Sequence, residues 1–450
     1  MNKSAYEKYN KEELEKAYNF CERYKTFITN AKTEREAIIE TIKIAEENGF
    51  TNIKNVKKLK PGDKVYAINM DKAVVLAVIG TNPLEDGFNI VGSHIDSPRL
   101  DLKPTPLYED SELCLLDTHY YGGIKKYQWT ATPLALHGII VKKDGTKIRV
   151  NYGENSGDAV LGITDLLPHL DKEKRNEVVT GEELNLLAGL VPDKDAKKDK
   201  VKQNILNILK EKGIEEDDFF SAEIECVPAG CARDFGLDRS MVMAYGQDDK
   251  VCAYPSLMAL LSQNNPKRTC ICLLVDKEEI GSVGATGMES MFFENTVADL
   301  IAKTEEYSEL KVRHGLANSK MLSSDVTAAF DPNRPSPFNK NTDAFLGRGI
   351  AFCKYTGSRG KSGASDANPE YIAQLRNILD KNNIYFQATE MGKVEAGGGG
   401  TIAYIMAKYD MDVIDAGVPV LSMHAPWEVT SKVDIYETFL CYDAFYREMK

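Results

Sequence analysis

The stretch TCICLLVDKEEIG occupies residues 269–281 and holds the pattern on which the fold assignment rests. Its first seven residues form an apolar run that predicts a strand, and charged residues follow directly. Cys270 and Cys272 are two residues apart, which places both on one face of that strand. The stretch therefore predicts a buried strand that ends in carboxylates.

The same succession of apolar run, loop and helix repeats from about residue 222 to the C-terminus. Further strands are predicted at 221–227, 241–245, 350–355, 384–388 and 418–423. The helices predicted between them are 253–263, 289–304, 367–381, 401–408 and 433–450. Strands that alternate with helices predict an α/β fold, here a mixed sheet with helices on both faces.

A β-rich section interrupts this alternation near residues 100–236. It contains a predicted hairpin, with strands at 134–141 and 146–150 around a Lys-Lys-Asp-Gly turn. We therefore expect an inserted β-rich domain at 100–236, with the main α/β domain formed by 1–99 and 237–450.

Two other segments have a clear composition. Apolar residues recur near helical spacing over residues 6–48, and Gly49 closes the pattern, which predicts one long helix. Lys, Glu and Asp crowd residues 171–218, which is typical of a solvated loop or the outer face of a helix.

Composition excludes several classes of protein. The chain has 450 residues, 43% of them hydrophobic and 28% charged, which is a globular balance. Its net charge of −12 disfavours nucleic acid and anionic membrane surfaces as partners. The longest apolar run, near 73–79, is far shorter than the ~20 residues that span a bilayer. The first residues, MNKSAY, lack the apolar core of a secretory signal.

Nine cysteines occur without a C-x-x-C pair. An odd, scattered set favours free thiols over a disulfide framework or a thiolate metal site. These features together predict a cytoplasmic protein.

Five segments share a feature that composition does not predict, since each ends a strand-like apolar run with Asp, Glu or His. They are GSHIDS at 92–97, YGQDDK at 245–250, VDKEEIG at 275–281, LSSD at 322–325 and LSMH at 421–424. In an open α/β sheet the carboxyl ends of the strands face the crevice where ligands bind. We therefore expect these side chains to converge on one place.

Two His and three carboxylates suit a divalent cation such as Zn²⁺, Co²⁺ or Mn²⁺. Two cations ~3.5–4 Å apart need a shared ligand, and Asp248 is the predicted bridge. His94 and Asp325 are then left for one cation, and Glu279 and His424 for the other. Asp325 and Glu279 can exchange places in this partition.

The Glu278-Glu279 doublet predicts two roles for neighbouring carboxylates. Adjacent side chains point in different directions, so Glu279 can bind a cation while Glu278 acts as general base and acid. In the string His94-Ile95-Asp96, the Asp96 carboxylate is spaced to accept the second imidazole N–H of His94 and fix its tautomer.

Each of these residues also has an ordinary structural explanation when taken alone. The Glu278-Glu279 pair can be surface charge, His94 a buried polar residue, and Asp325 a helix N-cap. The coincidence of five strand ends favours the metal centre.

The strings GSHIDSPRL at 92–100, QDD at 247–249, DKEEIGS at 276–282, SSD at 323–325 and MH at 423–424 carry a family resemblance. In this order, over nearly the whole chain, the sequence resembles the aspartyl aminopeptidase and vacuolar aminopeptidase I family of dinuclear metallo-aminopeptidases. The resemblance implies an α/β catalytic domain, an inserted β-rich dimerisation or lid domain, and assembly into a tetrahedral dodecamer. The ligands that it implies are His94, Asp248 (bridging), Glu279, Asp325 and His424, with Glu278 as the base and Asp96 orienting His94.

The sequence departs from this family at two places that bear on substrate preference. Aspartyl members carry a Pro-His-Leu stretch, with a further His, that reaches a neighbouring subunit's site. This chain has His169 in such a stretch and no second His nearby. After Asp325 the family often has another His, where this chain reads TAAFD at 327–331.

Two further features are candidates for substrate contact. The glycine run that includes Gly399 and Gly400 precedes a helix, so it can line the substrate cleft or offer N–H groups to an anion. Lys354 ends a strand-like run and, by resemblance, falls near a basic residue that meets an acidic substrate side chain. An exposed lysine is the alternative.

The sequence thus predicts an aminopeptidase that removes single N-terminal residues, acidic or neutral, from peptides with a free N-terminus. The related alternatives are a carboxypeptidase or deacylase built on the same ligands. The alternative from another class is a non-catalytic scaffold of the same fold.

Overall fold

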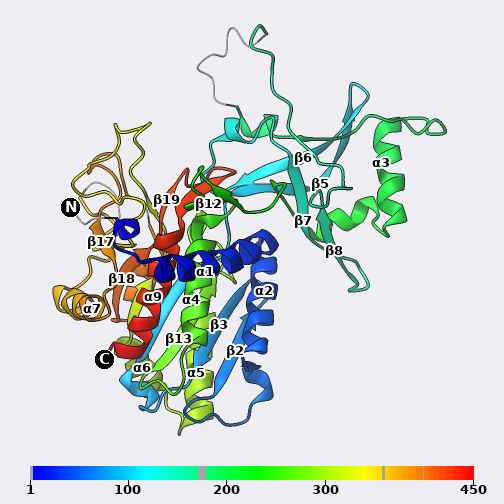
Figure 1. Cartoon of the computed structure of the whole chain (residues 1–450). Coiled ribbons are helices and arrows are strands. Elements are labelled where there is room, and N and C mark those ends of the chain that lie inside the picture. Colours follow the sequence, from blue (N-terminus) through cyan, green and yellow to red (C-terminus); the bar gives the residue numbers. More distant parts are fainter. Residues whose placement is uncertain (1–3, 171–178, 357–359, 399) are drawn as a thin grey trace. The chain divides into compact units, whose positions relative to one another are not determined.

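The computed structural model describes residues 4–170, 179–356, 360–398 and 400–450, which form two compact units (Figure 1). The first unit comprises Met1–Asp96, Ala232–Met423 and Glu428–Lys450. The second comprises Ser97–Cys231 together with His424–Trp427. These units are defined by contacts, and the domain boundaries that the sequence suggested stay a prediction.

A nine-stranded mixed sheet forms the centre of the first unit, in the order β1-β2-β3-β13-β4-β14-β18-β16-β17. The strands are β1 (Thr51–Asn52), β2 (Lys64–Asn69), β3 (Ala73–Val78), β13 (Thr269–Val275), β4 (Phe88–His94), β14 (Lys320–Ser323), β18 (Asp412–Gly417), β16 (Ile350–Cys353) and β17 (Phe386–Thr389). β4 lies between β13 and β14 and runs parallel to both. Their carboxyl ends therefore meet at one edge of the sheet.

Helices cover both faces of this sheet, which confirms the predicted α/β fold. On one face lie α1 (Lys11–Asn30), α2 (Glu34–Glu47), α4 (Gln247–Leu261), α7 (Pro369–Lys381) and α9 (Lys432–Glu448). On the other lie α5 (Phe292–Thr304), α6 (Glu309–Ala317) and α8 (Ala403–Ala407). Strand side chains alternate between the two cores: Cys270 and Cys272 enter the first, whereas Ile271 and Leu273 enter the second.

The single helix predicted over 6–48 is wrong, because the chain breaks between α1 and α2. Thr33 caps α2, since its side chain accepts the N–H of Glu36 while the Glu36 carboxylate accepts the N–H of Thr33. This Thr-x-x-Glu capping box satisfies backbone donors that a continuous helix would have bonded internally. The capping box is visible in the sequence. It sets the start of a new helix even though the apolar spacing continues across the break.

A small five-stranded sheet, in the order β11-β12-β20-β19-β15, also belongs to the first unit. Its strands are β11 (Arg233–Phe235), β12 (Met241–Ala244), β20 (Glu428–Ser431), β19 (Pro419–Leu421) and β15 (Thr327–Ala328). The strand predicted at 418–423 is β19 of this sheet. β18, which enters the main sheet just before it, was not predicted because two aspartates interrupt its apolar run.

The second unit is built on a six-stranded antiparallel sheet, in the order β8-β7-β10-β5-β6-β9. Its strands are β5 (Arg99–Asp110), β6 (Leu113–Tyr121), β7 (Leu134–Val141), β8 (Lys147–Tyr152), β9 (Leu186–Gly189) and β10 (Ala222–Pro228). β7 and β8 form the hairpin that the sequence predicted. Helix α3 (Lys200–Glu211) lies in the charged segment and buries only Val201, as expected for a solvated helix.

All nine cysteines are unpaired thiols, and eight of them are buried. This agrees with the free thiols that the sequence predicted. Burial raises the pKa of those in the main sheet, including Cys353, whose pKa lies at about 11, so they are poor nucleophiles at neutral pH.

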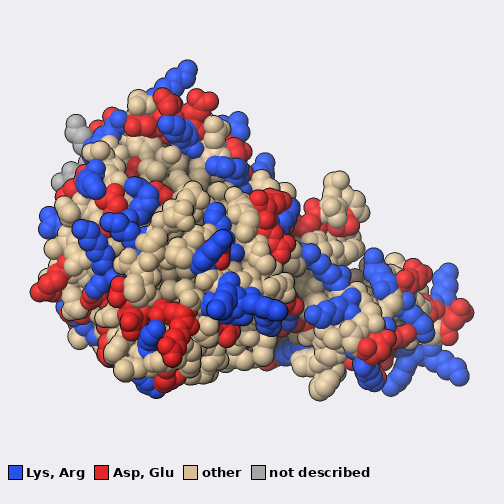
Figure 2. All heavy atoms as spheres, turned by 90° about the horizontal axis from the view of Figure 1, so that it is seen from below, with Lys and Arg blue, Asp and Glu red and all other residues tan. Residues whose placement is uncertain are grey.

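The face seen in Figure 2 carries Lys and Arg interspersed with Asp and Glu. Within the described ranges, every helix is too short or too polar to cross a bilayer.

Candidate metal centre

Three neighbouring strands bring predicted ligands to one edge of the main sheet. β4 ends at His94, and β14 ends at Ser323, two residues before Asp325. The N–H of Ser324 donates to the carbonyl of Gly92 at 2.7 Å, which continues the pairing of β14 with β4 and keeps Asp325 beside His94. β13 ends at Val275 and leads into the turn that carries the glutamate doublet.

The expectation that all five segments end strands of one sheet is wrong. The strands that precede Asp248 and His424 are β12 and β19, which belong to the five-stranded sheet. Both strands are short, and a local apolar pattern does not reveal which sheet a short strand joins.

Asp248 reaches the centre from the first turn of α4, not from a strand end. Its backbone N–H donates to the Glu428 carboxylate at 3.1 Å, and the Gln247 side chain donates to the Glu428 carbonyl at 2.6 Å. Both contacts fix the start of α4 to β20. Sequence reasoning did not identify Glu428; its signal was an acidic residue opening a buried β-run just after the predicted ligand His424.

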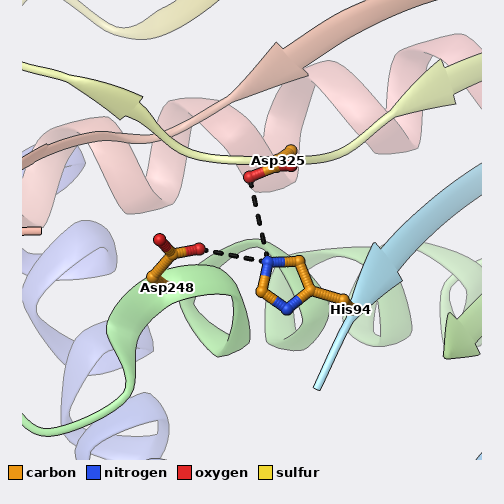
Figure 3. A group of neighbouring side chains, drawn as sticks. All are labelled: His94, Asp248 and Asp325. Carbon is orange, nitrogen blue, oxygen red and sulfur yellow. Dashed lines mark hydrogen bonds and ion pairs between the residues drawn. The ribbon is translucent and has the colours of Figure 1, made fainter. Parts of the chain in front are cut away.

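His94, Asp248 and Asp325 converge, as Figure 3 shows. The Nε2 atom of His94 lies 3.1 Å from Oδ1 of Asp248 and 4.0 Å from Oδ1 of Asp325. One ligand atom from each of the three lies within 4.8 Å of the others. Glu278 stands beside them, with Oε2 3.8 Å from the same His94 nitrogen.

Asp96 is fully buried and connects the imidazole to the glutamate doublet. One carboxylate oxygen lies 3.2 Å from Nδ1 of His94. The two oxygens also accept the backbone N–H groups of Glu278 and Glu279, each at 3.2 Å. Because the oxygens beside Nδ1 are acceptors, Nδ1 carries the proton, and Nε2 is the nitrogen turned toward Asp248 and Asp325.

The electrostatics of this group favour a bound cation. Burial lowers the pKa of His94, but its hydrogen bonds to Asp248 and Asp96 and the charge of Glu278 raise that pKa well above its usual range. Burial, together with the charge of Glu278, raises the pKa of Asp325 well above the usual value. Clustered carboxylates in a poorly solvated place repel one another, and a divalent cation relieves that repulsion. An imidazole nitrogen with carboxylate oxygens is a ligand set that fits zinc.

The remaining predicted ligands are held by well-defined contacts. The N–H of Glu279 is bound to Asp96, as described above. His424 belongs to the second unit, where its Nδ1 lies 2.9 Å from the carbonyl oxygen of Gly123. A carbonyl only accepts, so Nδ1 of His424 carries the proton and Nε2 is the nitrogen suited to bind a metal.

The predicted substrate contacts are less defined. Lys354 is half exposed and pairs with Asp366 at 3.8 Å. His169 lies exposed in the second unit, and Gly400 is exposed before α8. Gly399 lies outside the described residues. The role of each stays a prediction.

The comparisons with known proteins cover almost the whole chain. Residues 27–446 match the family described as aminopeptidase I zinc metalloprotease (M18). The probable M18 family aminopeptidase 1 of Clostridium acetobutylicum is 58% identical over 453 residues, which cover 98% of this chain and 97% of the relative.

Solved structures give the same picture. The crystal structure of an M18 family aminopeptidase from Thermotoga maritima superposes with a TM-score of 0.96 at 42% identity, covering 100% of both chains. The mApe1 dodecamer of S. cerevisiae superposes with a TM-score of 0.75 at 20% identity, over 94% of this chain and 95% of that one, and shows the shared fold. This chain belongs to the M18 family of zinc metallo-aminopeptidases.

Proposed function

We propose that the chain releases the N-terminal residue of peptides at a centre of two divalent cations, with zinc as the first choice and Co²⁺ or Mn²⁺ as alternatives. His94 and Asp325 hold one cation, Glu279 and His424 hold the other, and Asp248 is shared. The observation that carries this proposal is the convergence of His94, Asp248 and Asp325 on one point. Glu278 stands within reach of that point.

A bound divalent cation supplies Lewis acidity, which polarises the scissile carbonyl and makes water more acidic. Glu278 accepts the proton of the attacking water and returns it to the leaving amine. The backbone of Glu278 is fixed through its N–H to Asp96, and Asp96 also orients His94. The buried Asp96 carboxylate thus fixes the backbone of Glu278, the proposed base, relative to His94, a proposed metal ligand.

A panel of end-blocked peptides tests the aminopeptidase assignment. We expect a peptide with a free N-terminus to be cleaved whether or not its C-terminus is amidated, and N-acetylation to abolish cleavage. The free amine is the group that an aminopeptidase recognises, so mass spectrometry of the products reports on it directly. Peptides that begin with Asp, Glu or Leu in the same panel show whether an acidic residue is preferred, as a substrate contact by Lys354 would give.

The opposite pattern would contradict the assignment. Cleavage that survives N-acetylation and fails after C-amidation indicates a carboxypeptidase, and release of acetate alone indicates a deacylase. A purified chain that is inactive with zinc, cobalt and manganese indicates a scaffold.

We also propose that copies of the chain assemble into a dodecamer, as the S. cerevisiae relative named above does. The fold is shared over almost the full length of both chains, which supports this proposal. Light scattering coupled to size-exclusion chromatography is expected to give twelve times the chain mass. A mass of one or two chains at micromolar concentration would contradict the dodecamer.

A further inference from the structure

A lysine in the first turn of α4 is completely buried beside the centre. Lys250 follows Asp248 by two residues and has 0% of its surface exposed. Its Nζ atom donates to the carbonyl oxygen of Ile95 at 3.2 Å. Burying an ammonium group costs several kcal/mol of desolvation, so lysines are almost never fully buried unless they are paired. The ammonium group is therefore held by specific contacts, and the contact with Ile95 is one of them.

The residue before it makes a matching contact. Asp249 is also fully buried, and its Oδ2 atom accepts the backbone N–H of His94 at 3.3 Å. Two successive side chains of α4 thus bind the backbone of two adjacent residues. The Asp249 carboxyl accepts the N–H of His94, and the Lys250 side chain donates to the carbonyl of Ile95.

The opposite side of the same turn is fixed by β13 and its continuation. The N–H of Ile95 donates to the carbonyl of Val275 at 2.9 Å. One residue further on, the Asp96 side chain accepts the backbone N–H groups of the glutamate doublet. The turn that carries His94 is therefore bound from α4 on one side and from β13 on the other.

We infer that Lys250 and Asp249 are positioning residues that hold the His94 turn against α4. They thereby raise the affinity of the centre for the cation that His94 is proposed to bind. This inference rests on the proposed function of His94 as a ligand. Asp248 and the two residues that make these contacts are consecutive at the start of α4, so one short segment sets the separation between two proposed ligands of the same cation. Groups that orient metal ligands typically change metal affinity by about 10–100-fold when they are removed.

The charge of Lys250 alone would have the opposite effect. A cation near the centre repels a second cation, so a purely electrostatic role predicts tighter metal binding when the ammonium is removed. A positioning role predicts weaker binding. Whether zinc affinity rises or falls when Lys250 is replaced therefore distinguishes the electrostatic role from the positioning role.

The test is zinc affinity of the full-length protein, measured by competition with a chromophoric chelator. In Lys250→Met the zinc Kd is expected to rise about 10–100-fold. Lys250→Arg keeps the charge and a donor and is expected to recover most of the affinity. The matched control is Lys432→Met, which removes another buried lysine, 1% exposed, whose Nζ lies 2.9 Å from Asp234. That control is expected to leave the zinc Kd unchanged.

Unchanged or tighter zinc binding in Lys250→Met overturns the inference, and so does an equal weakening in Lys432→Met. Circular dichroism of the zinc-free proteins shows whether each variant folds. If Lys250→Met does not fold, Lys250→Gln removes the charge and is too short for the Ile95 contact, with the same expected rise in Kd. If neither variant folds, Lys250 serves the fold as a whole and its assignment to the centre is wrong.

The same measurement distinguishes a failure of this inference from a failure of the proposed metal centre. Wild-type protein that binds no zinc, or an Asp325→Asn variant that binds zinc as tightly as wild type, contradicts the proposed centre. Zinc binding that is lost in Asp325→Asn but kept in Lys250→Met contradicts only the positioning role.

Discussion

Replacing Glu278 with glutamine is expected to lower kcat by about 10²–10⁴-fold, which is the usual contribution of general acid–base catalysis. The amide is nearly isosteric but cannot accept the proton of the attacking water. The fold around it is expected to hold, because Asp96 binds the backbone N–H of Glu278, which the substitution leaves unchanged. Steady-state kinetics on an aminoacyl substrate, together with the zinc content per chain, measure both effects.

The neighbouring residue provides the control for this prediction. Glu279→Gln makes the same chemical change one position along, in a residue whose N–H is bound by the same Asp96 carboxylate. It is expected to lose zinc as well as activity, because Glu279 is the proposed ligand. Zinc loss in the Glu278 variant with zinc retained in the Glu279 variant would indicate that Glu278 is the ligand and Glu279 the base. Near-normal turnover in Glu278→Gln would remove it from the mechanism.

Much of the fold was predictable because its central strands are long, apolar runs. β13 has the bounds that the sequence indicated, and the hairpin of β7 and β8 follows from its turn residues. Burial on both faces makes such runs continuous, and this is a local property of the chain. The same holds for His94, which lies at the carboxyl end of β4, where a ligand is expected.

Other features depend on partners distant in the sequence and were not predictable. β12 and β19 are short, and their place in a separate sheet is decided by pairing with β20. Asp248 reaches the centre from the helix that follows β12, so its predicted position at a strand end was only approximately right.

Two supporting residues of the centre, Lys250 and Glu428, were not identified from the sequence for a related reason. Lys250 lies in the YGQDDK string, yet its hydrogen bond goes to a backbone carbonyl, which cannot be recognised from residue type. Glu428 likewise acts on the backbone N–H of Asp248. Side chains that bind ligands can be recognised by their chemistry, whereas side chains that bind the backbone can be recognised only once the fold is known.

Asp248→Asn is the variant expected to have the largest effect on metal content. An ionised carboxylate has two oxygens and a negative charge to share between two cations, whereas an asparagine amide offers one neutral oxygen. The Asp248 backbone N–H still reaches Glu428 in the variant, so the start of α4 is expected to stay in place. We expect both zinc ions to be lost, as measured by plasma mass spectrometry after dialysis, together with peptide hydrolysis.

The adjacent aspartate is the matched control for that change. Asp249→Asn alters a residue that is also buried and lies next in the chain, yet the amide oxygen can still accept the His94 N–H. It is therefore expected to keep two zinc ions per chain. Two ions retained in Asp248→Asn would show that Asp248 does not bridge. Loss of a single ion in that variant, matched by the same loss in Asp325→Asn, would place Asp248 on the cation of His94 alone, because these three side chains share one point.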